Sequence, residues 1–394
     1  MTDPFSLYVH LPYCVRRCPY CDFNTYAVER VPEARYVETL EREVTFAAAQ
    51  PQWQGRRIST VFFGGGTPSL FSPASLGSLL ETFDRLFGIE FDAELTMEAN
   101  PGSFEGSAAE RLLGFRRAGL NRISIGAQTF DQQHLTTLGR IHSPHDTVAA
   151  VDAARAAGFD NLSCDLIAAI PGQTLQEWRD DLERVVALGP EHVSAYSLTY
   201  EEGTPLTGMK KAGLIQPAEE DLELEMFRAA HLNLTAAGFE HYEISNFARP
   251  GRASRHNLAY WTWRDYLALG AGAHGFAGGP PHQASPGACW GRRYANHRLP
   301  ETYMSAKDGA WHATEESLTR EMAIAEYLLV GLRLLEGISR SRFAALFGVS
   351  IEAAAPRVTE LESSGLLVVE EDRVRLSEHG LELGDAVIVR IAAG

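Results

Sequence analysis

Short apolar runs alternate with amphipathic segments through the first half of the chain. Each run, such as SLYVH or STVFF, has the length of a buried strand, and the runs begin near residues 6, 59, 94, 122, 161 and 192. The segments between them include 32–50, 73–87 and 175–188, where apolar residues recur at helical spacing. Because a crossover helix returns the chain in the same direction, the pattern predicts an α/β protein with a parallel sheet, open or closed into a barrel.

Polar and glycine-rich motifs follow five of these predicted strands. In chain order they are LPYCVRRCPYC, GGGTPS, ANPGS, AQTF and IPGQT. In a parallel barrel all such loops lie at the carboxyl edge of the strands, where barrel enzymes build their active sites. The sequence therefore predicts one functional site at this edge, formed by loops from five separate strands.

The rest of the chain divides into two further regions by composition. A helix is predicted over 212–237, and the region from 241 to 310 is rich in aromatic, histidine and glycine residues. The C-terminal pattern is three helices, a short hairpin and a final helix, which is typical of a winged-helix domain. We therefore expect a core over 1–240, an extension over 241–310 that completes it, and a helical, winged-helix-like domain over 311–394.

Charge and hydropathy limit the partners of the protein. The formal net charge is −16, which disfavours broad attraction to nucleic acid or to an anionic membrane. The winged-helix segment carries no basic face, because 338–376 contains five arginines against six acidic residues. The sequence has no apolar stretch of 18 residues and no signal-peptide pattern at its start. We expect a cytoplasmic protein without a transmembrane segment and without a nucleic-acid partner.

Three of the five cysteines, Cys14, Cys18 and Cys21, lie together in the loop after the first strand. Clustered thiols in a cytoplasmic protein indicate a metal site more often than a disulfide. Three thiolates can hold a [4Fe–4S] cube with one iron left open, and S-adenosylmethionine (SAM) can chelate that iron through its amino and carboxylate groups. The CxxxCxxC spacing after a first strand is the signature of the radical SAM superfamily.

Two other metal sites compete with this interpretation. A structural zinc would need four ligands, with His10 as the fourth. A ferredoxin-type cluster would need a fourth cysteine, and Cys164 and Cys289 are candidates only by elimination. Cys164 lies inside an apolar strand, where a buried structural thiol is the usual explanation.

Two glycine-rich motifs differ in what they predict. The GGGTP motif, 64–68, lets a ligand approach the backbone closely, and beside the cysteines we assign it to the amino end of SAM; the alternative is a plain tight turn. The segment 270–275 fits GxGxxG, but no acidic residue follows at the distance that a dinucleotide site needs. We expect that second segment to be a loop near the open end of the barrel.

With YVHLPYCVRRCPYCDF, FFGGGTPS, TMEANP, ISIGAQTF and DLIAAIPGQT in order, the chain resembles the oxygen-independent coproporphyrinogen III oxidase family of radical SAM proteins. Within that family it is most similar to the haem chaperone branch, HemW. The resemblance covers nearly the whole chain, and it implies a partial (β/α)6 barrel followed by a C-terminal helical domain.

The resemblance also implies which residues contact SAM, and all of them lie at or just beyond predicted strand ends. They are Tyr8 beside the sulfonium, Tyr20 beside the adenine, Gly65, Gly66 and Thr67 at the methionyl group, Glu98 at the ribose, and Gln128, Arg140 and Asp165 around the nucleoside. A simpler alternative for Glu98 and Asp165 is that they cap loops.

Two features separate the branches of the family. The porphyrinogen-decarboxylating enzymes carry a further cysteine two positions after the third, where this chain has Phe23, and they have a longer segment before the cluster. The motif His256-Asn-Leu-Ala-Tyr-Trp261 matches the HNxxYW motif that the resemblance links to haem binding. A neutral imidazole is a good axial ligand for haem iron, so His256 is a candidate ligand, with a satisfied core histidine as the alternative.

The sequence therefore favours a haem chaperone that binds a [4Fe–4S] cluster, SAM and haem. Its expected partners are haem, haem-accepting proteins with respiratory ones among them, an electron donor to the cluster and a second copy of the chain in a homodimer. The alternatives are an enzyme, oxygen-independent coproporphyrinogen III oxidase, which makes protoporphyrinogen IX, and a radical SAM enzyme acting on another substrate.

Overall fold

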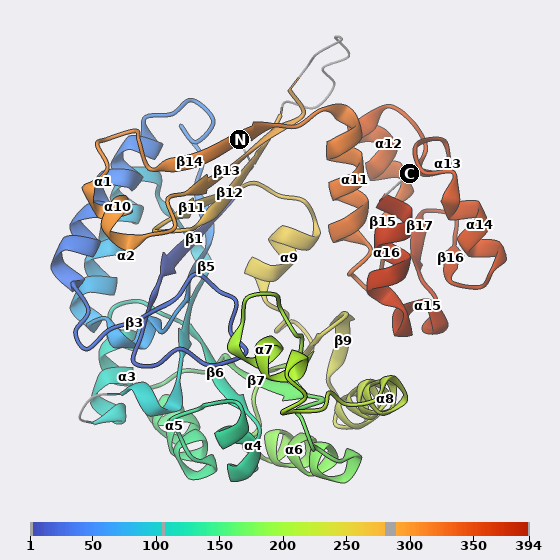
Figure 1. Ribbon diagram of the computed structural model, residues 1–394. Coiled ribbons are helices and arrows are strands. Elements are labelled where there is room, and N and C mark those ends of the chain that lie inside the picture. Colours follow the sequence, from blue (N-terminus) through green and yellow to red (C-terminus); the bar gives the residue numbers. More distant parts are fainter. Residues whose placement is uncertain (1–2, 105–106, 280–288, 393–394) are drawn as a thin grey trace.

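The computed structural model describes residues 3–104, 107–279 and 289–392, and its main feature is one large curved sheet (Figure 1). Within these ranges the sheet has twelve strands in the order β14-β13-β12-β11-β1-β4-β5-β6-β7-β8-β10-β9. Seven neighbouring strands are parallel: β11 (Tyr266–Leu269), β1 (Phe5–Leu11), β4 (Ile58–Gly65), β5 (Ile89–Ala99), β6 (Arg122–Gln128), β7 (Leu162–Ala168) and β8 (His192–Ser197).

All six predicted strands are present and parallel, which confirms the α/β fold with a barrel-like sheet. The seventh parallel strand, β11, was not predicted, because it is only four residues long and lies within the aromatic-rich region. It pairs with β1 in parallel, with Tyr8 opposite Ala268. The first strand of the chain is therefore an interior strand, with β4 on its other side.

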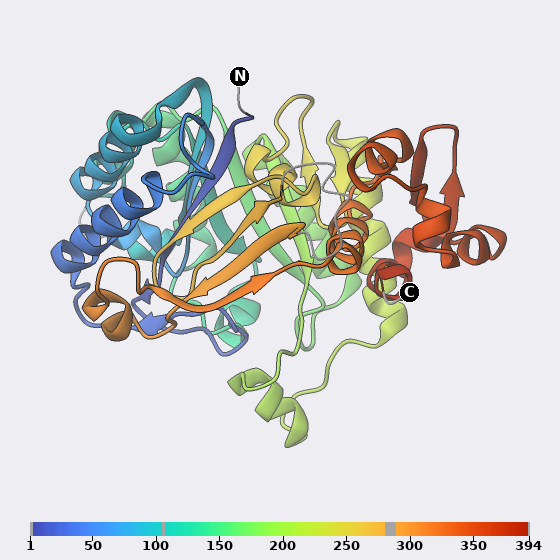
Figure 2. The same ribbon diagram turned by 90° about the horizontal axis from the view of Figure 1, so that it is seen from above.

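Helices cover the outer face of the parallel strands (Figures 1 and 2). They are α1 (Glu33–Ala48), α2 (Pro73–Phe87), α3 (Ala108–Arg117), α4 (Gln132–Thr137), α5 (Pro144–Ala156), α6 (Leu175–Leu188) and α8 (Glu220–Ala236). The predicted start of the last helix, residue 212, is wrong. A shorter helix, α7 (Pro205–Lys211), ends there, and Gly213 at a φ of 69° breaks the helical path, so α8 begins at Glu220.

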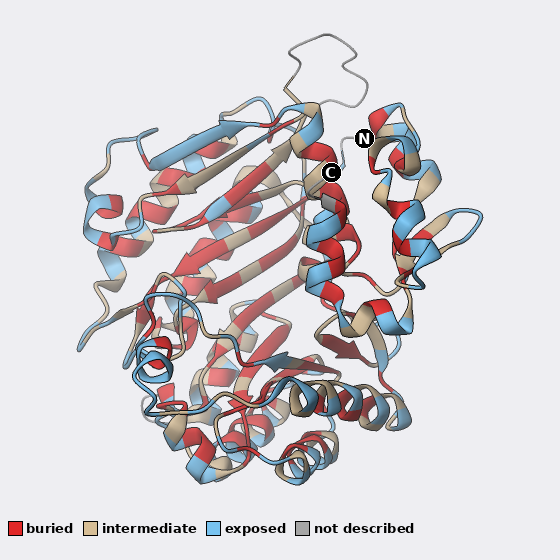
Figure 3. Ribbon diagram, turned by 45° about the vertical axis from the view of Figure 1, so that its right-hand side comes forward, coloured by how far each residue is buried: buried red, intermediate tan, exposed pale blue. Residues whose placement is uncertain are grey.

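Side chains along β1 point alternately to the core under the helices and to the interior of the barrel. Phe5, Leu7 and Val9 belong to the apolar core under the helices, and Figure 3 shows such buried positions along the strands. Because successive side chains of a strand point to opposite faces, Tyr8 and His10 point into the barrel, where both line a cavity. The inside of the barrel is therefore free to carry polar and aromatic groups.

Antiparallel strands between residues 240 and 317 extend both edges of the sheet. Beside β8 lie β10 (Asn246–Ala248) and β9 (Glu240–Glu243), and beside β11 lie β12 (His274–Gly278), β13 (Gly291–Asn296) and β14 (His312–Ser317). The expected boundary at 311 falls directly before β14, which pairs with β13. Two short helices complete the region, and α9 lies in the opening of the barrel (Figure 1): α9 (Arg255–Trp261) and α10 (Pro300–Ser305).

The C-terminal region is helical with a small sheet, as predicted, but among the described residues four helices precede the hairpin and two follow it, where three and one were predicted. Its helices are α11 (Arg320–Gly331), α12 (Arg340–Phe347), α13 (Ile351–Ala354), α14 (Arg357–Ser363), α15 (Glu378–Glu382) and α16 (Gly384–Ala392). The hairpin β16 (Leu367–Val369) and β17 (Arg373–Leu376) follows α14, and β15 (Ile338–Ser339) pairs with β17. The core of this region includes Phe276 of β12, so it packs against the edge of the barrel. None of the described helices is long and apolar enough to cross a membrane.

Gly270 directly follows β11, where the chain passes very close to the end of β1. Its φ is 103°, and a Cβ atom there would lie 2.3 Å from the carbonyl oxygen of His10. We expect Gly270→Ala to lower the urea midpoint of unfolding by more than Gly158→Ala does. Gly158 has a comparable φ of 89° with open space around it, so its substitution costs only the backbone strain of about 1 kcal/mol. Equal midpoints for the two variants would contradict this packing constraint.

Candidate functional site

The cysteine loop lies at the carboxyl end of β1. It is closed at its base by β2 (Tyr13–Cys14) and β3 (Tyr26–Ala27), which pair in parallel. Cys14, Cys18 and Cys21 are partly buried, and all three line a cavity of about 440 Å³. The structure thus brings the three predicted cluster ligands to one wall of one cavity.

Polar side chains approach each of the three sulfur atoms. Thr67 Oγ1 donates a hydrogen bond to Cys14 Sγ over 3.4 Å, and Arg140 Nη1 lies 3.9 Å from Cys18 Sγ. The hydroxyl of Thr25 lies 3.8 Å from Cys21 Sγ. Burial raises the pKa of the Cys14 thiol to about 11 despite the Thr67 hydrogen bond, so a bound cation would be needed to hold it as a thiolate at neutral pH.

Two observations bear on the single-ion alternatives to a cluster. In the described part of the chain, no three cysteine, histidine or acidic side chains lie close enough to hold one metal ion. His10 does not serve as a fourth zinc ligand, because its Nδ1 bonds Tyr8 Oη and its Nε2 bonds the carbonyl oxygen of Asn24, both over 2.9 Å. Cys164 is fully buried in β7, next to Asp165, which faces the cavity.

Most residues with a predicted SAM contact line this same cavity. Tyr8 instead lines an adjoining cavity, together with Gly65 and Glu98, which border both. The structure adds Asn100, Ser124 and Tyr196, each at or near a strand end. The predicted residues that line the cavity are Tyr20, Gly65, Gly66, Thr67, Glu98, Gln128, Arg140 and Asp165.

Backbone hydrogen bonds join the GGGTP loop to the cysteine loop. The amide N–H of Gly66 donates to the carbonyl oxygen of Leu11, and that of Thr67 donates to the carbonyl oxygen of Tyr13, both over 2.9 Å. The N–H of Gly65 donates to Glu98 Oε2 over 3.0 Å. Because these three N–H groups are used within the protein, a ligand at this loop would meet carbonyl oxygens, which suit an ammonium group.

Two buried carboxylates face the cavity. Burial, together with the nearby charge of Asp165, raises the pKa of Glu98 to about 7, although the Gly65 N–H opposes this shift. Burial also raises the pKa of Asp165, which accepts a hydrogen bond from Ser124 Oγ over 2.9 Å. Glu98 therefore fixes the glycine loop and also presents a carboxyl group to a ligand, so loop capping does not exclude ligand binding.

Two further polar residues, Gln128 and Arg140, line the cavity of about 440 Å³. Gln128 follows a break in the register between β6 and β7 and has a φ of 67°, a strained conformation for a residue with a side chain. Arg140 Nη2 donates to the carbonyl oxygen of Gly126 over 2.9 Å, while its buried Nε has no partner in the described chain. An unpartnered buried donor fits a polar ligand in this cavity.

The adjoining cavity is larger, about 680 Å³, and opens between β1, β12 and α9. Phe23, which is 64% exposed, and Glu98 line both cavities, so the two share a wall. The lining of the larger cavity includes two aromatic side chains from α9, Tyr260 and Trp261, and His274 at the start of β12. The 270–275 segment thus turns between two strands and leads into no helix, which agrees with its rejection as a dinucleotide motif.

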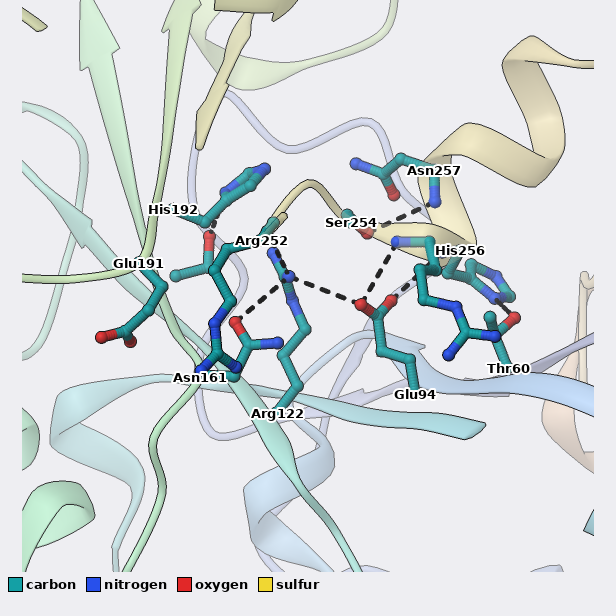
Figure 4. A network of polar contacts seen from close by, with 12 residues as sticks. Thr60, Glu94, Arg122, Asn161, Glu191, His192, Arg252, Ser254, His256 and Asn257 are labelled. Carbon is teal, nitrogen blue, oxygen red and sulfur yellow. Dashed lines mark hydrogen bonds and ion pairs between the residues drawn. The ribbon is translucent and has the colours of Figure 1, made fainter. Parts of the chain in front are cut away.

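His256 is buried and does not line this cavity. It belongs to a network of polar contacts that includes Thr60 and Glu94 (Figure 4). Its Nδ1 bonds Thr60 Oγ1 over 2.7 Å and its Nε2 bonds Tyr260 Oη over 2.8 Å. Its backbone N–H donates to Glu94, which is paired with Arg122 over 3.5 Å. Burial lowers the pKa of His256 to about 3. Both ring nitrogens are therefore occupied inside the protein, and Tyr260 lines the cavity in its place.

Comparison with known proteins places the chain in a family. The model of the radical SAM superfamily matches residues 8–185, and that of the HemN C-terminal domain matches 318–383. Among solved structures, the coproporphyrinogen III oxidase HemN from Escherichia coli is 22% identical and superposes with a TM-score of 0.78, over 99% of this chain and 89% of that one. This likeness shows that the two proteins share a fold.

Similarity to curated proteins extends over the full chain. Heme chaperone HemW from Escherichia coli is 37% identical, over 96% of this chain and 95% of the relative. Heme chaperone HemW from Bacillus subtilis is 35% identical over 97% of both chains. A bovine mitochondrial radical S-adenosyl methionine domain-containing protein 1 is 36% identical, over 98% of this chain and 87% of the relative. The chain therefore belongs to the HemW family of radical SAM proteins.

Proposed function

We propose that the protein is a cytoplasmic haem chaperone that delivers haem to acceptor proteins. In this proposal Cys14, Cys18 and Cys21 hold a [4Fe–4S] cluster, and SAM binds in the cavity beside it. The observation that carries the proposal is the second cavity, which adjoins the cluster loop and is lined by aromatic and basic side chains in a chain with full-length similarity to haem chaperones.

The residues around the first cavity have separate tasks in this proposal. A [4Fe–4S] cluster with one open iron binds SAM and supplies an electron for its reductive cleavage. Thr67 and Arg140 stabilise thiolates by donating hydrogen bonds to their sulfur atoms. Glu98 and Asp165 offer acceptors for ribose hydroxyls, and the carbonyl oxygens of the glycine loop offer acceptors for the amino group.

The competing function is oxygen-independent oxidation of coproporphyrinogen III. The shared fold with HemN is compatible with it. Phe23, however, stands where the resemblance implies a further cysteine in the decarboxylating enzymes, and its exposed ring lies between the two cavities. We propose that this position lines the route to the porphyrin cavity instead of supplying a thiol.

A direct comparison of the two activities tests the proposal. Reconstituted protein is loaded with haem and mixed with a soluble apo-cytochrome b, and in parallel it is incubated with SAM, a reductant and coproporphyrinogen III. We expect haem transfer, followed by the spectrum of the holo-cytochrome, and no decarboxylated product by mass spectrometry. Formation of decarboxylated product at an enzymatic rate would refute the proposed chaperone function in favour of the oxidase function.

The cluster assignment predicts how cysteine variants behave. Cys14→Ala, Cys18→Ala and Cys21→Ala each remove one of three ligands, so we expect reconstituted protein to lose its brown colour and most of its iron and sulfide. Cys289→Ala is the matched control, because Cys289 is also partly exposed but does not line either of the two described cavities. Wild-type iron content in all three ligand variants would refute the assignment.

The raised pKa of Glu98 predicts a pH dependence of SAM binding. The ionised carboxylate attracts a cationic ligand, so affinity should rise as the pH increases through about 7. For a single group of this pKa, binding at pH 6 should be about tenfold weaker than at pH 8. Equilibrium dialysis with cluster-loaded protein measures this, and Glu98→Gln should bind more weakly and flatten the profile. An unchanged slope in that variant would exclude Glu98 as the titrating group.

A further inference from the structure

Haem binding needs three chemical features in one place. They are a ligand for the iron, flat apolar surface for the porphyrin faces, and cations for the two propionate groups. The cavity of about 680 Å³ beside the cysteine loop is lined by histidine, aromatic and arginine side chains. Its size lies within the range of pockets that hold cofactor-sized ligands.

His274 is the histidine of this cavity with a free ring. It is exposed at the start of β12, and its side chain makes no hydrogen bond within the described part of the chain. His10 lines the same cavity, but both of its ring nitrogens are bonded, as are those of His256. Burial and the charge of Arg298 lower the pKa of His274, which keeps its imidazole in the neutral form that binds iron.

Aromatic side chains line the same cavity as His274. Tyr260 and Tyr266 meet edge to face at 4.7 Å between ring centroids, and Tyr266 lies 6.1 Å from Phe276. All three line the cavity, as does Trp261. They come from α9 and from the adjacent strands β11 and β12, so they are held by secondary structure and by the packing of the C-terminal region on Phe276.

Three arginines line the cavity, and two of them are available to carboxylate groups. Arg293 is paired with Glu316 and with Glu326, so its charge is already compensated. Arg264 and Arg298 are exposed and make no ion pair within the described residues. The guanidinium group of Arg298 makes one long contact of 3.5 Å, with Asn24 Oδ1. Two exposed guanidinium groups without ion pairs in the described residues match two propionates.

From this geometry, and resting on the haem chaperone function proposed above, we propose that His274 binds the iron of the cargo haem in the cavity beside the cluster loop. The aromatic side chains of α9, β11 and β12 pack on the porphyrin, and Arg264 and Arg298 pair with its propionates. His256 is then a positioning residue. Its hydrogen bonds to Thr60 and Tyr260 hold the Tyr260 side chain in its position in the cavity lining.

Comparing the binding of two porphyrins, one with iron and one without, distinguishes the iron ligand from the residues that contact only the porphyrin. Ferric haem and iron-free protoporphyrin IX are each titrated into cluster-loaded wild type, His274→Ala and the control His379→Ala, whose ring is exposed on α15. We expect His274→Ala to weaken haem binding by about tenfold or more and to shift the Soret band, while protoporphyrin binding changes less than about twofold. Arg264→Gln with Arg298→Gln should weaken both porphyrins, and His379→Ala should change neither.

The ligand role has a second signature. Free imidazole added to His274→Ala should restore the wild-type haem spectrum, and His274→Met should give a spectrum of a different axial ligand. Circular dichroism and cluster absorbance check that each variant is folded. A wild-type haem spectrum in His274→Ala would overturn the proposal. So would a folded His256→Gln variant that loses the wild-type Soret band while His274→Ala keeps it. Wild type that binds neither porphyrin would instead refute the haem chaperone function itself.

Discussion

Two backbone hydrogen bonds between the cysteine loop and the glycine loop hold the site together. They run from Gly66 and Thr67 to the carbonyl oxygens of Leu11 and Tyr13, and they need the loops in van der Waals contact. A Cβ atom on Gly66 would lie 2.7 Å from the Leu11 oxygen. The chain thus fixes three thiols relative to the ends of β1 and β4 through main-chain groups, which leaves the side chains of the barrel interior to bind ligands.

The sequence predicted the parts of the fold that follow from local periodicity. Six strands and the helices between them are apolar or amphipathic over their whole length, and sharp turn and cap residues bound them, such as Ser72 before α2 and the Thr174–Glu177 capping box of α6. The same logic predicted one cavity for most of the residues expected to contact SAM, because the carboxyl ends of parallel strands meet at one edge. Their individual roles came only from the resemblance to a family.

Features that depend on long-range contact escaped prediction. Strand β11 is four residues long and is defined by its pairing with β1, more than two hundred residues away in sequence. The motif around His256 drew attention to the histidine, yet a one-dimensional motif does not report that Thr60 and Tyr260 occupy both ring nitrogens. His274 carried a weaker signal, as the histidine of a glycine-rich turn, and only the fold shows that the turn opens into a cavity.

The shared wall between the two cavities has a thermodynamic consequence. Glu98 and Phe23 each contact both spaces, so a ligand that reorients either side chain in one cavity changes the surface offered to a ligand in the other. Binding energies on the two sides of such a wall are not independent, and whatever the first ligand does to the affinity of the second, the second does to the first. Coupling of this kind would arise at the four residues that line both cavities, which are Asp22, Phe23, Gly65 and Glu98.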